Sequence, residues 1–182
     1  LSSRYVYKVV GSIGPESHDG TELCVLNCTI RFDKLSGVLE YEADQRHAKL
    51  IVRELGLEGA KAVRTPRDKK PAKDILAESS SPKLQSLDHT LYRSLVRRAS
   101  YLSQDRGDIC ESVKTLVRQM KEPRQCDMHA LKRLGRLLKG RPQVVLRFSP
   151  QIFCNNLDVY SDSDNTGSLV TRSSTSGTIA IH

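Results

Sequence analysis

The chain has 182 residues and a formal net charge of +8, and hydrophobic residues make up 38% of it, with no tryptophan. This length allows one domain of ordinary size or two small ones around a modest core. No run of 18 apolar residues occurs and the first twenty residues lack a secretory pattern, which excludes a membrane-spanning helix and argues against export. We therefore expect an intracellular protein, cytoplasmic or nuclear, with no membrane partner.

The first 41 residues carry strand and turn signals. Short runs rich in β-branched and aromatic side chains lie at residues 5–10, 23–26, 29–32 and 38–41, with glycine-containing turns between them. This pattern predicts an antiparallel β meander.

Residues 42–56 change to a helical period. Their apolar side chains recur at three- and four-residue steps, and Gly56 lies where a helix cap is expected, which predicts an amphipathic helix. Glu42, Asp44 and His47 can be interpreted as a metal site. Because basic residues alternate with them, ordinary ion pairs are the favoured interpretation.

The two cysteines nearest to this region, at positions 24 and 28, have no second pair at zinc spacing, so we expect reduced thiols.

Residues 64–87 contain three prolines and a triple serine and are predicted to be a linker. Three helices are predicted over residues 88–140, each with an apolar stripe and an aspartate as N-cap: Asp88, Asp108 and Asp127. The last two helices leave open a helix-turn-helix interpretation, but the connection between them is longer than that motif uses.

Positive charge is concentrated in these helices. Residues 92–141 contain thirteen Lys and Arg against five Asp and Glu, an excess of eight that equals the net charge of the whole chain. A solvated helical face is the ordinary explanation, but such concentration favours a polyanionic partner, a nucleic acid backbone. The residues expected to bind it are Arg93, Arg97, Arg98, Lys132, Arg133, Arg136 and Lys139.

A strand over residues 144–148 and a β-hairpin over residues 157–181 complete the predicted elements. Asp162 and Asp164 are two residues apart on the first strand of the hairpin, so their side chains share one face. Two like charges on one face favour a divalent cation beside them. This arrangement is one edge of a metal site and not a whole site.

Several sequence blocks, in this order, resemble the Pol polyprotein of copia-type retrotransposons. They are YEADQRHA from residue 41, TP from 65, YRSLV from 92, YLS from 101, DI from 108, LKR from 131, LKG from 138, YSDSD from 160 and TRSSTSG from 171. Each block alone is weak, whereas their order covers nearly the whole chain. At residues 165–167 this chain has Asn-Thr-Gly, where the family usually has Trp-Ala-Gly. This is one of several departures from the family pattern that fit a decayed genomic copy.

The resemblance implies the C-terminal part of a reverse transcriptase followed by the opening of a ribonuclease H domain. The expected fold class is α+β, with a β meander and helix, a three-helix basic thumb-like bundle, and a hairpin from an incomplete ribonuclease H-like fold. The expected divisions are residues 1–66 (palm-like), 67–87 (linker), 88–142 (thumb-like) and 143–182 (connection strand and hairpin). Since the chain starts at Leu1, we expect it to be a piece of something longer.

The resemblance also implies catalytic residues that are mostly missing. The chain has no Asp-Asp pair of the polymerase kind, and Asp162 matches the first ribonuclease H carboxylate, with Asp164 beside it. We therefore expect Mg²⁺ only if further sequence completes that site. The leading hypothesis is a fragment that binds template–primer or RNA–DNA hybrid without catalysis. The alternatives are an active RNA-directed DNA polymerase/ribonuclease H completed by the remainder of the polyprotein, and a domesticated protein-interaction module.

Overall fold

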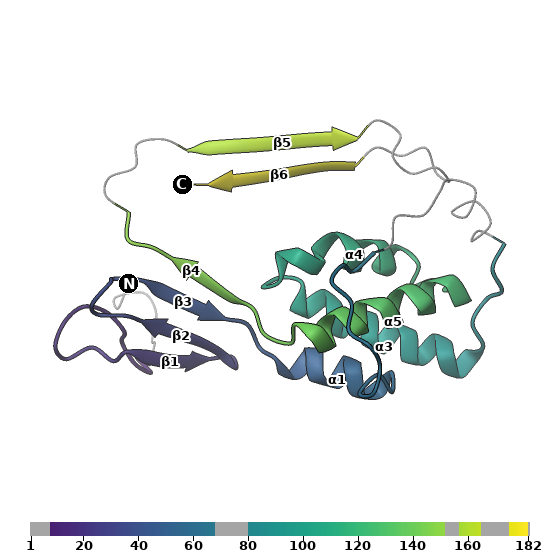
Figure 1. Cartoon of the computed structure of the whole chain (residues 1–182), viewed down its shortest axis with the longest axis horizontal. Helices are drawn as coiled ribbons and strands as arrows, with labels where there is room; N and C mark the ends of the chain where they lie inside the picture. The colour runs from purple at the N-terminus through teal and green to yellow at the C-terminus, as the bar shows by residue number, and fades with distance from the viewer. Residues whose placement is uncertain (1–7, 68–79, 152–156, 165–174, 182) are drawn as a thin grey trace.

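A computed structural model describes residues 8–67, 80–151, 157–164 and 175–181 (Figure 1). These residues form a mixed α+β structure, with a four-stranded sheet at one end, four helices at the other and a separate β-hairpin. The α+β class expected from the sequence is confirmed.

The four-stranded sheet is antiparallel throughout, in the order β1-β2-β3-β4. Its strands are β1 (Glu22–Val25), β2 (Cys28–Phe32), β3 (Leu39–Glu42) and β4 (Val145–Phe148). The sequence predicted the meander β1-β2-β3, because the tight turns between its strands have a local sequence signal. Leu26 and Asn27 form the first turn with φ values of 50° and 64°, which is the backbone that a two-residue hairpin loop requires.

β4 completes the sheet from far along the chain. It pairs with β3 in the register Leu39↔Phe148 and Glu42↔Val145, and the described helices all lie between the two strands in sequence. The strand itself was predicted from its composition. Its partner was not, because a long-range pairing has no signal in local periodicity.

Four helices share one hydrophobic core: α1 (Arg46–Glu54), α3 (Ser86–Leu102), α4 (Gly107–Arg118) and α5 (Gln125–Gly140). Leu95, Ile109 and Leu134 are fully buried in it. Ala48 and Ile51 of α1 are also fully buried there. The three helices predicted over residues 88–140 are present as α3, α4 and α5. The predicted helix before them, α1, was not expected to join their core, and it does so because its apolar stripe packs on α3 and α5.

The predicted N-caps are each displaced. α3, α4 and α5 follow Gln85, Arg106 and Arg124, so Asp88, Asp108 and Asp127 lie within the first turns. An aspartate in the first turn is still stabilised by the helix dipole, which explains why each aspartate lies within one turn of the observed helix start. Gly56, with φ +63°, follows α1 as predicted, although α1 begins at Arg46 because Glu42 belongs to β3.

Two further predictions concern the chain's ends. The expected strand over residues 5–10 lies partly outside the described residues, and residues 8–10 form no strand, with Val9 and Val10 exposed and unpaired with the sheet. The expected hairpin is present: β5 (Asp158–Asp164) pairs with β6 (Thr175–Ile181), with Asp162 opposite Gly177. Val159, Tyr160 and Ile179 of the hairpin are more than half exposed.

Candidate nucleic-acid interface

One face of α3 carries three arginines around an open hollow. Arg93 and Arg97 are exposed, Arg98 is half-buried, and together with Thr90 and Ser94 they line a space of about 450 Å³. These five positions follow the i, i+3, i+4, i+7, i+8 spacing of one helical face. The core stripe of α3 lies at other positions, so packing fixes this basic face toward solvent.

The α3 guanidiniums have no carboxylate partner among the described residues. The Nε atom of Arg98 is in addition buried without a hydrogen-bond partner there. Arginine presents its N–H groups in a fixed fork that matches phosphate oxygens, and serine and threonine hydroxyls are further donors. The α3 face therefore offers unused donors to an anion.

The basic residues of α5 are placed differently. We call residues 57–67 the strap, because this segment runs antiparallel along α5. Arg133 Nη2 donates to Thr65 Oγ1 at 3.1 Å, Arg136 Nε to the carbonyl oxygen of Lys61 at 2.7 Å, and Lys139 Nζ to that of Ala60 at 2.6 Å. Lys132, by contrast, is exposed.

Two glycines allow the strap to lie so close to α5. A Cβ atom at Gly135 would be 2.7 Å from Leu57 Cδ1, and one at Gly140 would be 2.9 Å from Ala62 Cβ. A side chain at either position would require its neighbours to move, the Leu57 side chain at Gly135 and Ala62 at Gly140. The strap thus covers part of the face that helical periodicity assigns to solvent.

The seven predicted nucleic-acid-binding residues accordingly separate into two groups. Arg93, Arg97 and Arg98 are brought together on α3 with free donor groups. On α5, Lys132 is exposed, whereas the other three predicted residues hold the strap. Sequence analysis missed Thr90 and Ser94, whose signal was their helical spacing from the arginines.

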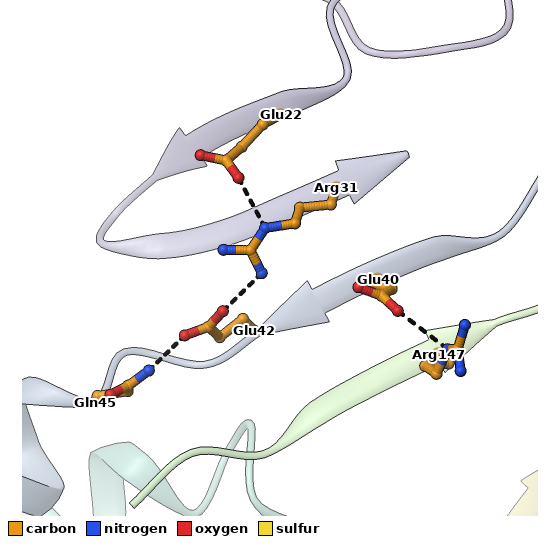
Figure 2. Close-up of polar contacts among 6 residues, drawn as sticks. All are labelled: Glu22, Arg31, Glu40, Glu42, Gln45 and Arg147. Atoms are coloured by element: carbon orange, nitrogen blue, oxygen red, sulfur yellow. Dashed lines mark hydrogen bonds and ion pairs between the residues drawn. The ribbon is translucent and has the colours of Figure 1, made fainter. Parts of the chain in front are cut away.

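The sheet's basic residues are neutralised by neighbouring carboxylates (Figure 2). Arg31 lies 2.7 Å from both Glu22 and Glu42, and Arg147 lies 3.1 Å from Glu40. Hydrogen bonds to Glu42 and Glu22 raise the pKa of Arg31, and the Arg31 hydrogen bond lowers the pKa of Glu42. Since cross-strand pairs of opposite charge stabilise sheets, these residues hold β1 to β4 together.

Ion pairing also accounts for Glu42 and Asp44, the two acids of the possible metal site noted in the sequence. Asp44, 3% exposed, accepts hydrogen bonds from the Arg46 guanidinium at 2.8 to 3.1 Å, and these bonds lower its pKa. The His47 ring lies against Tyr101, with the ring centroids 4.9 Å apart. The favoured interpretation as an ion pair is confirmed for Asp44 with Arg46, whereas Glu42 lies on β3 and pairs instead with Arg31 of β2.

The predicted carboxylate edge lies on the hairpin. Asp162 is exposed on β5, and Asp164 ends the same strand, with its side chain outside the described part. Within the described ranges, no three His, Cys, Asp or Glu side chains gather around a possible metal position. Among the described side chains Asp162 is the carboxylate at this edge, so Mg²⁺ bound there would complete its octahedral shell with water or with groups outside the described ranges.

Among curated proteins, the chain is similar to an uncharacterized mitochondrial protein, AtMg00810, of Arabidopsis thaliana. The two are 30% identical over 135 residues, which cover 72% of this chain and 52% of the relative. The chain therefore spans about half the length of the curated relative it matches. No protein-family model and no solved structure matches the chain. None of the described helices is long and apolar enough to cross a membrane.

Proposed function

We propose that this chain binds nucleic acid through its phosphate backbone, with the α3 face as the primary contact. The observation that carries the proposal is the set of three arginines and two hydroxyl residues around one open hollow, with no carboxylate neutralising them in the described structure. Such donors bind phosphate oxygens without reading bases. The ligand class is double-stranded, a template–primer or an RNA–DNA hybrid.

We also propose that the chain derives from the reverse transcriptase and ribonuclease H region of a retrotransposon polyprotein. The ordered sequence blocks over nearly the whole chain support this origin. The likeness to the Arabidopsis mitochondrial protein adds a relative that the aligned residues cover to 52%. A fragment with this origin is expected to retain duplex binding after losing catalysis, because binding depends on surface charge and not on an assembled metal site.

The test is binding of a fluorescently labelled RNA–DNA hybrid, measured by anisotropy over a range of salt concentrations. Affinity should fall steeply as salt rises, because each neutralised phosphate releases counterions. Arg93→Gln with Arg97→Gln should reduce the slope of log affinity against log salt by about 1.8, from about 0.9 per contact. Circular dichroism should show the fold unchanged, since both side chains are exposed.

The matched control changes two exposed cations of another helix, Lys49→Gln with Arg53→Gln on α1. This variant loses the same formal charge and should keep the wild-type salt slope. Equal slopes for the α1 and α3 variants would show that net charge, and not the α3 face, governs binding. A folded wild-type chain that fails to bind the hybrid at low salt would refute the proposal.

A further inference from the structure

The strap brings its own positive charge to the surface of α5. Residues 57–67 contain Lys61, Arg64 and Arg67 against a single acid, Glu58, and all three basic side chains are exposed. None of the three is paired with a carboxylate of the described chain. Lys132, exposed on α5 one residue before Arg133, is likewise unpaired with any carboxylate of the described chain.

The contacts that hold the strap are made to its backbone and to one hydroxyl. Arg136 and Lys139 bind the carbonyl oxygens of Lys61 and Ala60, and Arg133 binds the Thr65 hydroxyl. These acceptors carry no full negative charge. Arg136 and Lys139 therefore fix the strap through uncharged acceptors, and their positive charges stay close to those of the strap.

The length of this surface matches a run of phosphates. The strap contacts α5 from residue 133 to residue 139, which is about 9 Å at 1.5 Å per residue. One nucleic acid strand places a phosphate about every 3.4 Å along the axis, so two to three phosphates would lie over it. A phosphate run would supply anionic partners for these cations, which have no carboxylate partner among the described residues.

We infer that the strap is a second phosphate-binding surface, in which Lys61, Arg64, Arg67 and Lys132 contact the backbone of a nucleic acid. Arg136 and Lys139 are positioning residues that act through the strap. This inference rests on the proposed function and extends it, since residues of the strap enter the binding surface and two of the predicted contacts, Arg136 and Lys139, become positioning residues. The occupant is the same labelled RNA–DNA hybrid, bound across α3 and the strap.

The test compares contact and positioning residues in the salt-dependent binding assay. The triple variant Lys61→Gln, Arg64→Gln, Arg67→Gln should reduce the salt slope by about 2.7, from about 0.9 per contact. Arg64→Gln alone should lower affinity about three- to fivefold. Lys8→Gln, an exposed cation outside the helices, is its matched control and should change neither quantity.

Arg136→Met separates the two roles. The substitution should increase hydrogen exchange of the strap amides. It should lower the affinity for the hybrid when made in the wild type, but cause no further loss of affinity when added to the triple variant. An equal loss in both backgrounds would assign Arg136 to direct contact and overturn its positioning role. An unchanged slope in the triple variant, with the α3 variant still impaired, would overturn the inference alone. Absence of hybrid binding by the folded wild-type chain would instead refute the proposed function.

Discussion

The guanidinium of Arg106, only 1% exposed, holds both carboxylate oxygens of Asp108 at 2.8 Å. Its Nη1 atom also donates to the carbonyl oxygen of Arg141 at 2.9 Å. One buried side chain thus connects the start of α4 to the residue that follows α5. Since removing the anion of a buried ion pair leaves an uncompensated charge, this junction requires Asp108 beside Arg106.

Asp108→Ala should destabilise the protein by about 2–4 kcal/mol, because it leaves the buried Arg106 guanidinium without its anion. The measurement is urea denaturation followed by circular dichroism. Glu111→Ala is the control, since Glu111 makes only an exposed 3.6 Å pair with Lys114 and should cost less than about 0.5 kcal/mol. Similar losses in the two variants would contradict a special role for the Arg106–Asp108 pair.

Stability should fall in acid. The Arg106 hydrogen bond lowers the pKa of Asp108, and the Arg46 hydrogen bond lowers that of Asp44. Because each folded pKa lies below the unfolded value of about 3.9, the stabilisation is present above that pH and is lost as pH falls through the folded pKa. Denaturation at a series of pH values should show this loss, and Asp108→Asn should reduce it. An unchanged pH dependence in that variant would exclude Asp108 as a source.

Gly135→Ala should destabilise the protein by about 1–3 kcal/mol, because its new methyl group would meet Leu57 and Leu55 at 3.0 Å or less. Gly107→Ala is the matched control, since nothing lies within 4 Å of a Cβ atom there. That change should be neutral or stabilising by up to about 1 kcal/mol through helix propensity. Thermal unfolding measures both, and a Gly135→Ala variant as stable as Gly107→Ala would show that the Leu57 and Leu55 side chains move aside at no cost.

Tyr41→Phe should loosen the contact between the sheet and the helices. The Tyr41 hydroxyl lies 2.9 Å from Asp105 Oδ1, beyond the end of α3, and 3.1 Å from Cys28 Sγ on β2. Its removal should cost about 0.5–1.5 kcal/mol and increase hydrogen exchange in β2 and β3. Tyr101→Phe is the control, because Tyr101 is 45% exposed. Unchanged exchange in the Tyr41 variant would mean that the hydroxyl does not join the two units.

Asp162→Asn should leave both stability and hybrid binding unchanged, with or without Mg²⁺. The side chain is exposed on a hairpin and gathers no other ligands within the described residues. Denaturation and anisotropy measure the two properties. Tighter hybrid binding in Mg²⁺ that is lost in the variant would show that this chain assembles a metal site. In a longer polyprotein, the same substitution should lower Mg²⁺-dependent hybrid cleavage if Asp162 serves as a ribonuclease H carboxylate.

Sequence periodicity predicted most elements because it reports which side of each element is apolar. The meander, the helices of the basic region and the hairpin followed from it, as did the arginines on the outer face of α3. Helix starts were less predictable. An aspartate is favourable both as an N-cap and in the first turn, so Asp88, Asp108 and Asp127 marked each start only approximately.

The sequence by itself determined the concentration of positive charge, the two secondary-structure periods and the positions of the candidate carboxylates. Only the tertiary structure decided which charges are available. It placed α1 in the helical core, joined β4 to β3, and laid the strap against Gly135 and Gly140. The physical reason is that these are long-range contacts, set by shape and by backbone hydrogen bonds that no local pattern encodes. They left the arginines of α3 open to an anion and engaged Arg136 and Lys139 in holding the strap.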